Sequence, residues 1–318
     1  MLSRKLALGA GLLMLLLGSA CAHHMPAAAT PGGSALPPQV TAAQVPFFAQ
    51  EENQCGPASL AMVLQWTGLA VTPDELVSEV FTPDLGGSLQ TAMVTGARRH
   101  GRLAYAIQGE QALLAELAVG HPVIVLQNLG LSWFPLWHYA VALGYDRPDD
   151  AIVMHSGDIA LRRVSWNRFY HTWNRSGCWG LLVLAPGSLP VDADETAYLK
   201  AALGLEQAQQ WEAAQKAYHA ARRRWPDSLG AMMGEGNSQA ARGDWQAAEQ
   251  CFRAATLRYP QNGDGFNNLA HVLARQSRLD EARRAVEMAL AVGGPNTPIY
   301  RQTLNEIKSQ QIAPGAHP

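Results

Sequence analysis

Three side chains in the first half of the sequence have the types and the order needed for attack on a carbonyl group. Cys55 opens the apolar run CGPASLAMVLQW, Gln50 lies five residues before it, and His138 begins the later run HYAVALGYD. A thiolate that attacks an amide needs a general base, usually histidine, and hydrogen-bond donors for the oxyanion that forms. We therefore expect Cys55 to be the nucleophile and His138 the base. The side-chain amide of Gln50 and the backbone N–H of Cys55 are the expected oxyanion donors.

The sequence around these residues predicts the elements that hold them. Pro57 fits the first turn of a helix, where its missing N–H is not needed, so Cys55 falls at a helix N-terminus. The unpaired N–H groups and the dipole at that end lower the pKa of a thiol. His138 begins a predicted strand after the loop GLSWFPLW. We expect Trp133 to Trp137 of this loop to line the substrate groove, the alternative being a place in the core.

The region from Val45 to about Leu189 combines helical and strand patterns. Helices are predicted for the runs CGPASLAMVLQW, TPDELVSEVF, SLQTAMVTGARRHG and EQALLAELAVG, and strands for HPVIVLQN, HYAVALGYD, AIVMHSG and CWGLLVLAP. Helices that are followed by antiparallel strands indicate an α+β domain over residues 45–189.

The motifs QEENQCGPASLAMVL and HYAVALGYD resemble those of the papain-like peptidases that remove double-glycine leader peptides from bacteriocins. The resemblance covers residues 45–189 and implies a papain-like α+β fold. It also implies cleavage of a peptide bond through an acyl-thioester on Cys55, with His138 as base and Gln50 at the oxyanion. In the family this domain usually belongs to an ABC exporter. We identify no transporter segments in this sequence, so the leader-peptide substrate is not carried over.

Two positions depart from the pattern of that family. The family's glutamine usually lies six residues before the cysteine, whereas Gln50 lies five before it, and the adjacent Gln54 is the alternative donor. The family orients its histidine with an aspartate at the end of the next strand, which here reads IVMHSG. That place falls on His155 or Ser156, with Asp158 slightly beyond. Because a neutral asparagine orients the histidine in papain-like enzymes, a Cys–His dyad can work without the aspartate.

Residues 194–312 carry a repeat with a period of 34 residues. Five positions recur at that spacing, namely Trp211 and Trp245, Ala214 and Ala248, Tyr218 and Phe252, Ala221 and Ala255, and Pro226 and Pro260. This period and these residue types resemble the tetratricopeptide repeat, in which small residues let paired helices approach while the aromatic ring fills the space between them. We expect three repeats and a polar capping helix, with a surface that recruits a protein substrate or partner.

The N-terminus predicts export. Arg4 and Lys5 precede an apolar run that ends at Ala20, which is typical of a signal peptide over residues 1–20. The end of this run, LLGSAC, resembles the lipobox of bacterial lipoproteins and implies lipidation of Cys21, although Gly18 replaces the usual leucine. Ala22 favours an outer-membrane lipoprotein that faces the periplasm and is held at the membrane by its lipid. The Pro-, Gly- and Ala-rich residues 21–44 are then predicted to be a flexible tether.

Charge and cysteine spacing exclude several function classes. The chain has 24 basic and 26 acidic side chains and a net charge of −2, so we expect no nucleic-acid partner. The four cysteines form no CxxC pair, and HExxH is absent, so neither a metal nor another cofactor is expected. Three functions remain: an envelope-anchored cysteine peptidase, an inactive peptide-binding scaffold with the same two domains, and a transglutaminase or acyltransferase that uses the same dyad.

Overall fold

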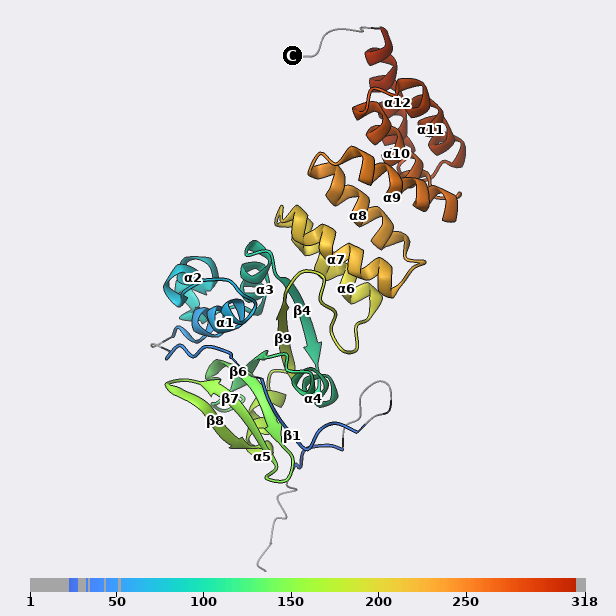
Figure 1. The fold of residues 1–318 in the computed structure, drawn as a ribbon. Helices are drawn as coiled ribbons and strands as arrows, with labels where there is room; N and C mark the ends of the chain where they lie inside the picture. The colour runs from blue at the N-terminus through green and yellow to red at the C-terminus, as the bar shows by residue number, and fades with distance from the viewer. Residues whose placement is uncertain (1–22, 28–32, 34, 43, 51–52, 313–318) are drawn as a thin grey trace, which may run out of the picture.

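The chain folds into an N-terminal domain built on one sheet, from which a stack of helices extends (Figure 1). The computed structural model describes residues 23–27, 33, 35–42, 44–50 and 53–312. The predicted signal peptide and the predicted lipidation site at Cys21 lie outside these residues. Among the described residues, no helix has the length and apolar character needed to cross a membrane.

The main sheet is antiparallel throughout and has the strand order β4-β9-β5-β6-β7-β8, with β1 added against β6. Its strands are β1 (Gln39–Thr41), β4 (Leu103–Gln108), β5 (Val123–Asn128), β6 (Trp137–Asp146), β7 (Ala151–Ser156), β8 (Ile159–Ser165) and β9 (Trp179–Leu184). A second small sheet pairs β2 (Phe81–Thr82) with β3 (Gly87–Ser88). The expected α+β class is confirmed.

Helices cover both faces of the main sheet. The helices α1 (Cys55–Trp66), α2 (Pro73–Val80) and α3 (Gln90–Arg99) pack on one face, and α4 (Glu110–Ala118) and α5 (Trp166–Asn174) on the other. Strand β6 serves both layers because successive side chains point to opposite faces. Tyr139 and Val141 join the core under α1, whereas Ala140 and Ala142 join the core under α4 and α5. By the same alternation, Tyr139 faces α1 and His138 faces the side of the sheet that α4 and α5 cover.

The C-terminal part consists of seven helices in antiparallel succession within the described residues. They are α6 (Glu195–Gln207), α7 (Trp211–Arg224), α8 (Leu229–Ala241), α9 (Trp245–Arg258), α10 (Gly263–Arg275), α11 (Leu279–Val292) and α12 (Thr297–Ile312). The repeating aromatic residues fill the space between paired helices, as the period predicts. A Cβ atom on Gly234 would lie 2.3 Å from the Tyr218 ring, and one on Gly236 would lie 2.7 Å from the Phe252 ring. Glycine is therefore required where these rings cross α8.

The first repeat helix packs against the sheet domain rather than hanging from a linker. Tyr198 of α6 is fully buried in the core that includes the strand residues Leu103 and Tyr105. Its hydroxyl donates to the carbonyl of Ser188 over 3.0 Å, and Gln210 donates to the carbonyl of Arg99 over 2.8 Å. The sheet and the first repeat helices thus share one hydrophobic core, whereas the later repeat helices form a separate one.

The predicted flexible tether is wrong for the part of residues 21–44 that the structure describes. Strand β1 lies within this segment, and the Leu36 side chain is 6% exposed in the sheet core. His23 stacks on Tyr170, with ring centroids 3.6 Å apart, and its Nε2 lies 2.7 Å from a Glu110 carboxylate oxygen. Scattered apolar and histidine side chains in a Pro- and Gly-rich segment therefore find partners that composition alone does not predict.

Candidate active site

Cys55 is the first residue of α1, where the helix meets strand β6. Its sulfur accepts hydrogen bonds from the backbone N–H groups of Tyr139, Gly56 and Cys55 itself. The helix approaches β3 so closely here that a Cβ on Gly56 would lie 2.2 Å from Ser88 Oγ. Glycine after the cysteine is therefore a packing requirement of this helix start.

The pKa of the Cys55 thiol is raised, contrary to the expectation for a helix N-terminus. Burial raises it, and the three backbone N–H groups lower it by a smaller amount. The helix end contributes the donors that the sequence predicts, but desolvation of the thiolate outweighs them. The resting side chain is therefore a neutral thiol that must lose its proton during attack.

His138 stands at the beginning of β6, one residue before the Tyr139 amide that contacts the Cys55 sulfur. Its Nε2 lies 2.9 Å from Ser156 Oγ, a hydrogen bond whose direction depends on the tautomer. Within the described residues, Nδ1 has no hydrogen-bond partner, and no hydrogen bond joins His138 to Cys55. Cys55 therefore lies against β6 on the face that α1 covers, whereas the His138 side chain contacts Ser156 on the opposite face of the sheet.

Burial and a nearby positive charge keep His138 neutral. Burial and, to a smaller extent, the positive charge of Arg162 together lower the pKa of its imidazole from 6.5 to about 4. A neutral imidazole is the form that can accept a proton. The same two causes oppose the imidazolium that forms once the proton has been accepted.

Among the three sequence candidates for the orienting residue, Ser156 is the one whose side chain contacts His138. His155 points elsewhere, because its Nε2 bonds the Val45 carbonyl over 3.2 Å and its Nδ1 accepts from the Leu161 N–H over 3.1 Å. Asp158 is exposed and forms no hydrogen bond or ion pair in the described part of the chain. The orienter is therefore a hydroxyl, which can donate as well as accept, whereas a carboxylate can only accept.

The side chain of Gln50 forms hydrogen bonds that connect α1, β6 and the turn after β7. Its Nε2 donates to the Tyr139 carbonyl over 3.2 Å and to Ser59 Oγ over 3.4 Å, and its Oε1 accepts from the Gly157 N–H over 3.1 Å. Both amide hydrogens therefore have acceptors on β6 and α1. The oxyanion role of Gln50 stays a prediction, and it requires one of these two bonds to be exchanged for the oxyanion. The alternative donor, Gln54, directly precedes α1.

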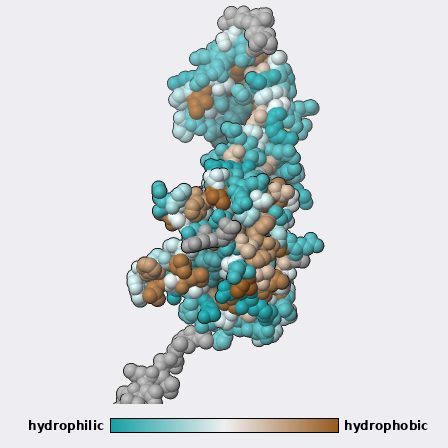
Figure 2. Space-filling model, turned by 90° about the vertical axis from the view of Figure 1, so that its left-hand side faces the viewer, coloured by the Kyte–Doolittle hydropathy of each residue, from teal (hydrophilic) through white to brown (hydrophobic). Residues whose placement is uncertain are grey.

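A groove of about 630 Å³ opens beside Cys55. One wall is the segment from Leu85 to Gln90, and the opposite wall includes Tyr139 and residues 135–137 of the β5–β6 loop. The predicted aromatic wall is therefore present at Trp137, which is 50% exposed. Trp133 and Phe134 do not line the groove and are about four-fifths exposed, at 81% and 78%. On the face in Figure 2, brown apolar residues gather on the lower, N-terminal part of the molecule, whereas the repeats above are mostly teal.

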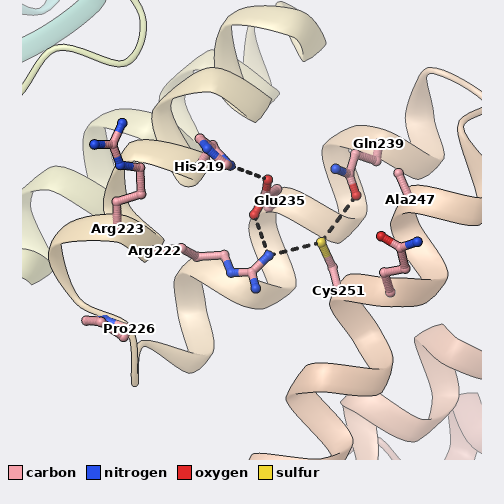
Figure 3. Close-up of a pocket in the computed structure, with 9 residues that line it drawn as sticks. His219, Arg222, Arg223, Pro226, Glu235, Gln239, Ala247 and Cys251 are labelled. Atoms are coloured by element: carbon pink, nitrogen blue, oxygen red, sulfur yellow. Dashed lines mark hydrogen bonds and ion pairs between the residues drawn. The ribbon is translucent and has the colours of Figure 1, made fainter.

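A separate open pocket of about 390 Å³ lies between α7, α8 and α9 of the repeats (Figure 3). The buried Glu235 carboxylate pairs with Arg222 over 2.7 Å and with His219 over 3.0 Å. Arg222 also donates to the Cys251 sulfur, and Gln239 accepts from it over 3.2 Å. Burial, then the Glu235 charge, raises the pKa of Cys251 to about 11. We therefore expect Cys251 to be a weakly reactive thiol, and Arg222 belongs to an ion pair within the repeats.

Two family models match the chain. Residues 42–180 match the Peptidase_C39 like family, and residues 199–248 and 233–298 match the tetratricopeptide repeat. No curated protein is similar enough to count as a relative.

Solved structures resemble each part separately. A protein from Bacillus anthracis described as a C39-like peptidase is 18% identical with a TM-score of 0.40, covering 46% of this chain and 97% of that one. The peptidase domain of Streptococcus ComA, a bifunctional ABC transporter of a quorum-sensing pathway, is 22% identical with a TM-score of 0.38, over 44% of this chain and 98% of its own. SycD, a type III secretion translocator chaperone of Yersinia enterocolitica, is 16% identical with a TM-score of 0.36, over 38% of this chain and 90% of its own.

Proposed function

We propose that this chain, which consists of a C39-like peptidase domain over residues 42–180 followed by tetratricopeptide repeats over residues 199–298, is a cysteine peptidase that cleaves a peptide bond with Cys55 and His138. The observation that carries the proposal is the position of the Cys55 sulfur. It lies against the backbone N–H of the residue that follows His138, at the edge of an open groove. Cys55 thus lies at the groove, and His138 holds the neighbouring position of β6 with its side chain on the face of the sheet opposite α1.

The reaction begins from a neutral thiol and a neutral imidazole. As Cys55 attacks the substrate carbonyl carbon, its proton passes to His138, whose imidazole must first turn from Ser156 toward α1 to reach the sulfur. The Cys55 backbone N–H, together with the Gln50 amide if it releases an acceptor, stabilises the oxyanion. His138 then protonates the leaving amine, which leaves an acyl-thioester on Cys55. Water, deprotonated by His138, hydrolyses this thioester and restores the free thiol.

Selective alkylation tests the dyad. Iodoacetamide followed by mass spectrometry reports the labelling rate of each cysteine, and the buried Cys178 and Cys251 serve as internal references. We expect Cys55 to label faster than the other two cysteines. In His138→Ala, the labelling rate of Cys55 should fall at least about tenfold, a smaller factor than the roughly 100-fold that a positioned base contributes to a reaction. Equally slow labelling of all three thiols in the wild type contradicts the proposal.

A second candidate is a peptide-binding scaffold that does not cleave its ligand. Arg162 lies near His138, and no carboxylate in the described part of the chain contacts this imidazole; both favour the scaffold because both weaken the base. A Cys55→Ala variant retains peptide partners under either function, so the discriminating result is whether the wild type releases cleaved forms of the partners that this variant captures. A transglutaminase or acyltransferase would instead transfer the acyl group from Cys55 to an added amine.

The proposed enzyme is an exported lipoprotein at the outer membrane, facing the periplasm, with Cys21 lipidated and the repeats recruiting a protein substrate or partner. The LLGSAC sequence supports the anchor, and the repeat family supports a protein or peptide ligand. Membrane fractionation of Cys21→Ser tests the anchor. We expect the variant to leave the membrane fraction while the wild type stays in it.

A further inference from the structure

We propose that a cavity beside Ser156 binds a carboxylate, which supplies from outside the chain the negative charge that the dyad lacks. This inference rests on the proposed peptidase function and names the ligand class that completes its site. The carboxylate is either a small free anion or a side chain of the bound peptide.

The cavity lies on the face of the sheet opposite α1 and has a volume of about 250 Å³. Its walls come from β5, β7, β8 and α5, and they include Gln127, Met154, Ser156, Arg162, Arg168 and Thr172. Ser156 and Gln127 are each only 5% exposed, so two polar side chains are buried at its base. Gln127 is the direct partner of His138 in the β5–β6 ladder, which places the cavity next to the imidazole.

The charges around this cavity are unbalanced. Arg162 and Arg168 both line it, and none of its lining residues carries a carboxylate. Neither guanidinium forms a hydrogen bond or an ion pair with the part of the chain that the structure describes. The neighbouring Arg163 differs, because it pairs with Asp146 over 3.0 Å and with Asp149 over 2.7 Å. Two unpaired guanidinium groups over a polar base favour an anion, and their planar forks match a carboxylate.

A bound carboxylate would determine the tautomer of His138 through Ser156. The Ser156 hydroxyl carries one hydrogen and makes one hydrogen bond in the described structure, to His138 Nε2. If a carboxylate accepts that hydrogen, the Ser156 oxygen must accept a hydrogen from Nε2. Nδ1 then carries the lone pair, which can accept the Cys55 proton once the imidazole turns toward the sulfur. Neutralising Arg162 would also remove one of the two causes that make His138 a weak base.

Binding is measured with sodium formate and the full chain. We expect saturation-transfer NMR to detect formate on the wild type and to lose the signal in Arg162→Gln/Arg168→Gln. Arg163→Gln is the matched control, since it removes an arginine from the same strand outside the cavity, and it should bind formate normally. Absence of formate binding to the wild type, or equal binding to the double variant, overturns the proposal whatever the activity of Cys55.

The labelling rate of Cys55 shows whether the bound anion increases the basicity of His138 toward this thiol. We expect formate to raise the iodoacetamide labelling rate of Cys55 about tenfold in the wild type, a part of the roughly 100-fold or more that a positioned base contributes, and to saturate. The double variant should not respond. Ser156→Asp places a carboxylate in the chain itself and should label fast without formate. A Cys55 rate that formate leaves unchanged in the wild type overturns the link to His138.

Two further comparisons show whether the carboxylate comes from the substrate or from a free anion, and whether the anion site and the peptidase proposal stand independently. The first comparison uses a blocked peptide that contains one Asp and the same peptide with Asn in its place. If only the Asp peptide displaces formate, the carboxylate belongs to the substrate. If neither peptide displaces formate, the carboxylate is a free anion. If formate binds at the arginines but Cys55 never labels faster than Cys178 and Cys251, the anion site stands and the peptidase proposal fails. If Cys55 labels faster than Cys178 and Cys251 but formate does not bind, the peptidase proposal stands and the anion site fails.

Discussion

Replacing His138 with glutamine should remove a defined part of the pH dependence of stability. Folding lowers the pKa of this imidazole from 6.5 to about 4. The unfolded chain therefore binds a proton between these pH values while the folded chain does not, so stability falls as the pH falls through this window. The difference of about 2.5 pKa units, at about 1.36 kcal/mol each, gives about 3 kcal/mol lost between pH 6.5 and pH 4.

Urea unfolding at pH 7.5, 5.5 and 4 tests this value in wild type and His138→Gln. The other titrating groups are common to both proteins, so their contributions cancel when the two pH profiles are subtracted. We expect the free energy of unfolding of the wild type to fall by about 3 kcal/mol more than that of the variant between pH 7.5 and pH 4. Parallel profiles would refute the reasoning, because they would mean that folding does not disfavour the imidazolium. The same free energy opposes proton transfer from Cys55, so the result also bears on catalysis.

Three further predictions concern the packing around the two domains. Gly56→Ala should lower the free energy of unfolding by about 1–3 kcal/mol, because its Cβ would lie 2.2 Å from Ser88 Oγ, whereas Gly87→Ala, with no atom closer than 4.0 Å, should change it little in the same urea titration. Gln50→Ala should cost about 1–3 kcal/mol and slow Cys55 labelling, since it leaves the Tyr139 carbonyl and the Gly157 N–H without their partner; unchanged stability would show that water replaces the amide. Cys251, with a pKa raised to about 11, should resist alkylation at pH 8 until the repeats unfold, and rapid labelling in the native protein would contradict its burial.

The sequence by itself determined the elements that depend on local pattern. The 34-residue period predicted paired helices with an aromatic ring in the space between them, and Tyr218 and Phe252 lie in that space, each against a glycine of α8. Pro57 and the apolar run after it likewise predicted a helix that begins at Cys55. Such signals are readable because the residues that make each contact recur at a fixed spacing within one segment.

Local pattern missed elements whose residues do not alternate cleanly. Strands β4 and β8 and helix α5 were not predicted. Strand β4 is mostly buried and β8 almost entirely exposed, so neither shows along its whole length the period of two that a half-buried strand has. The packing of β1 and His23 on the domain was missed for a related reason, since their partners lie more than eighty residues away.

Tertiary structure alone decided the chemistry of the candidate site. It selected Ser156 from three possible orienters, since β7 turns that hydroxyl toward His138 and turns His155 toward Val45. It also reversed the expected direction of the Cys55 pKa, because desolvation depends on everything packed around the sulfur, whereas the helix dipole can be read from the helix start. Sequence spacing reports which groups a segment carries. The burial and the charges that tune those groups come from segments far apart in the chain, and only the folded sheet brings them together.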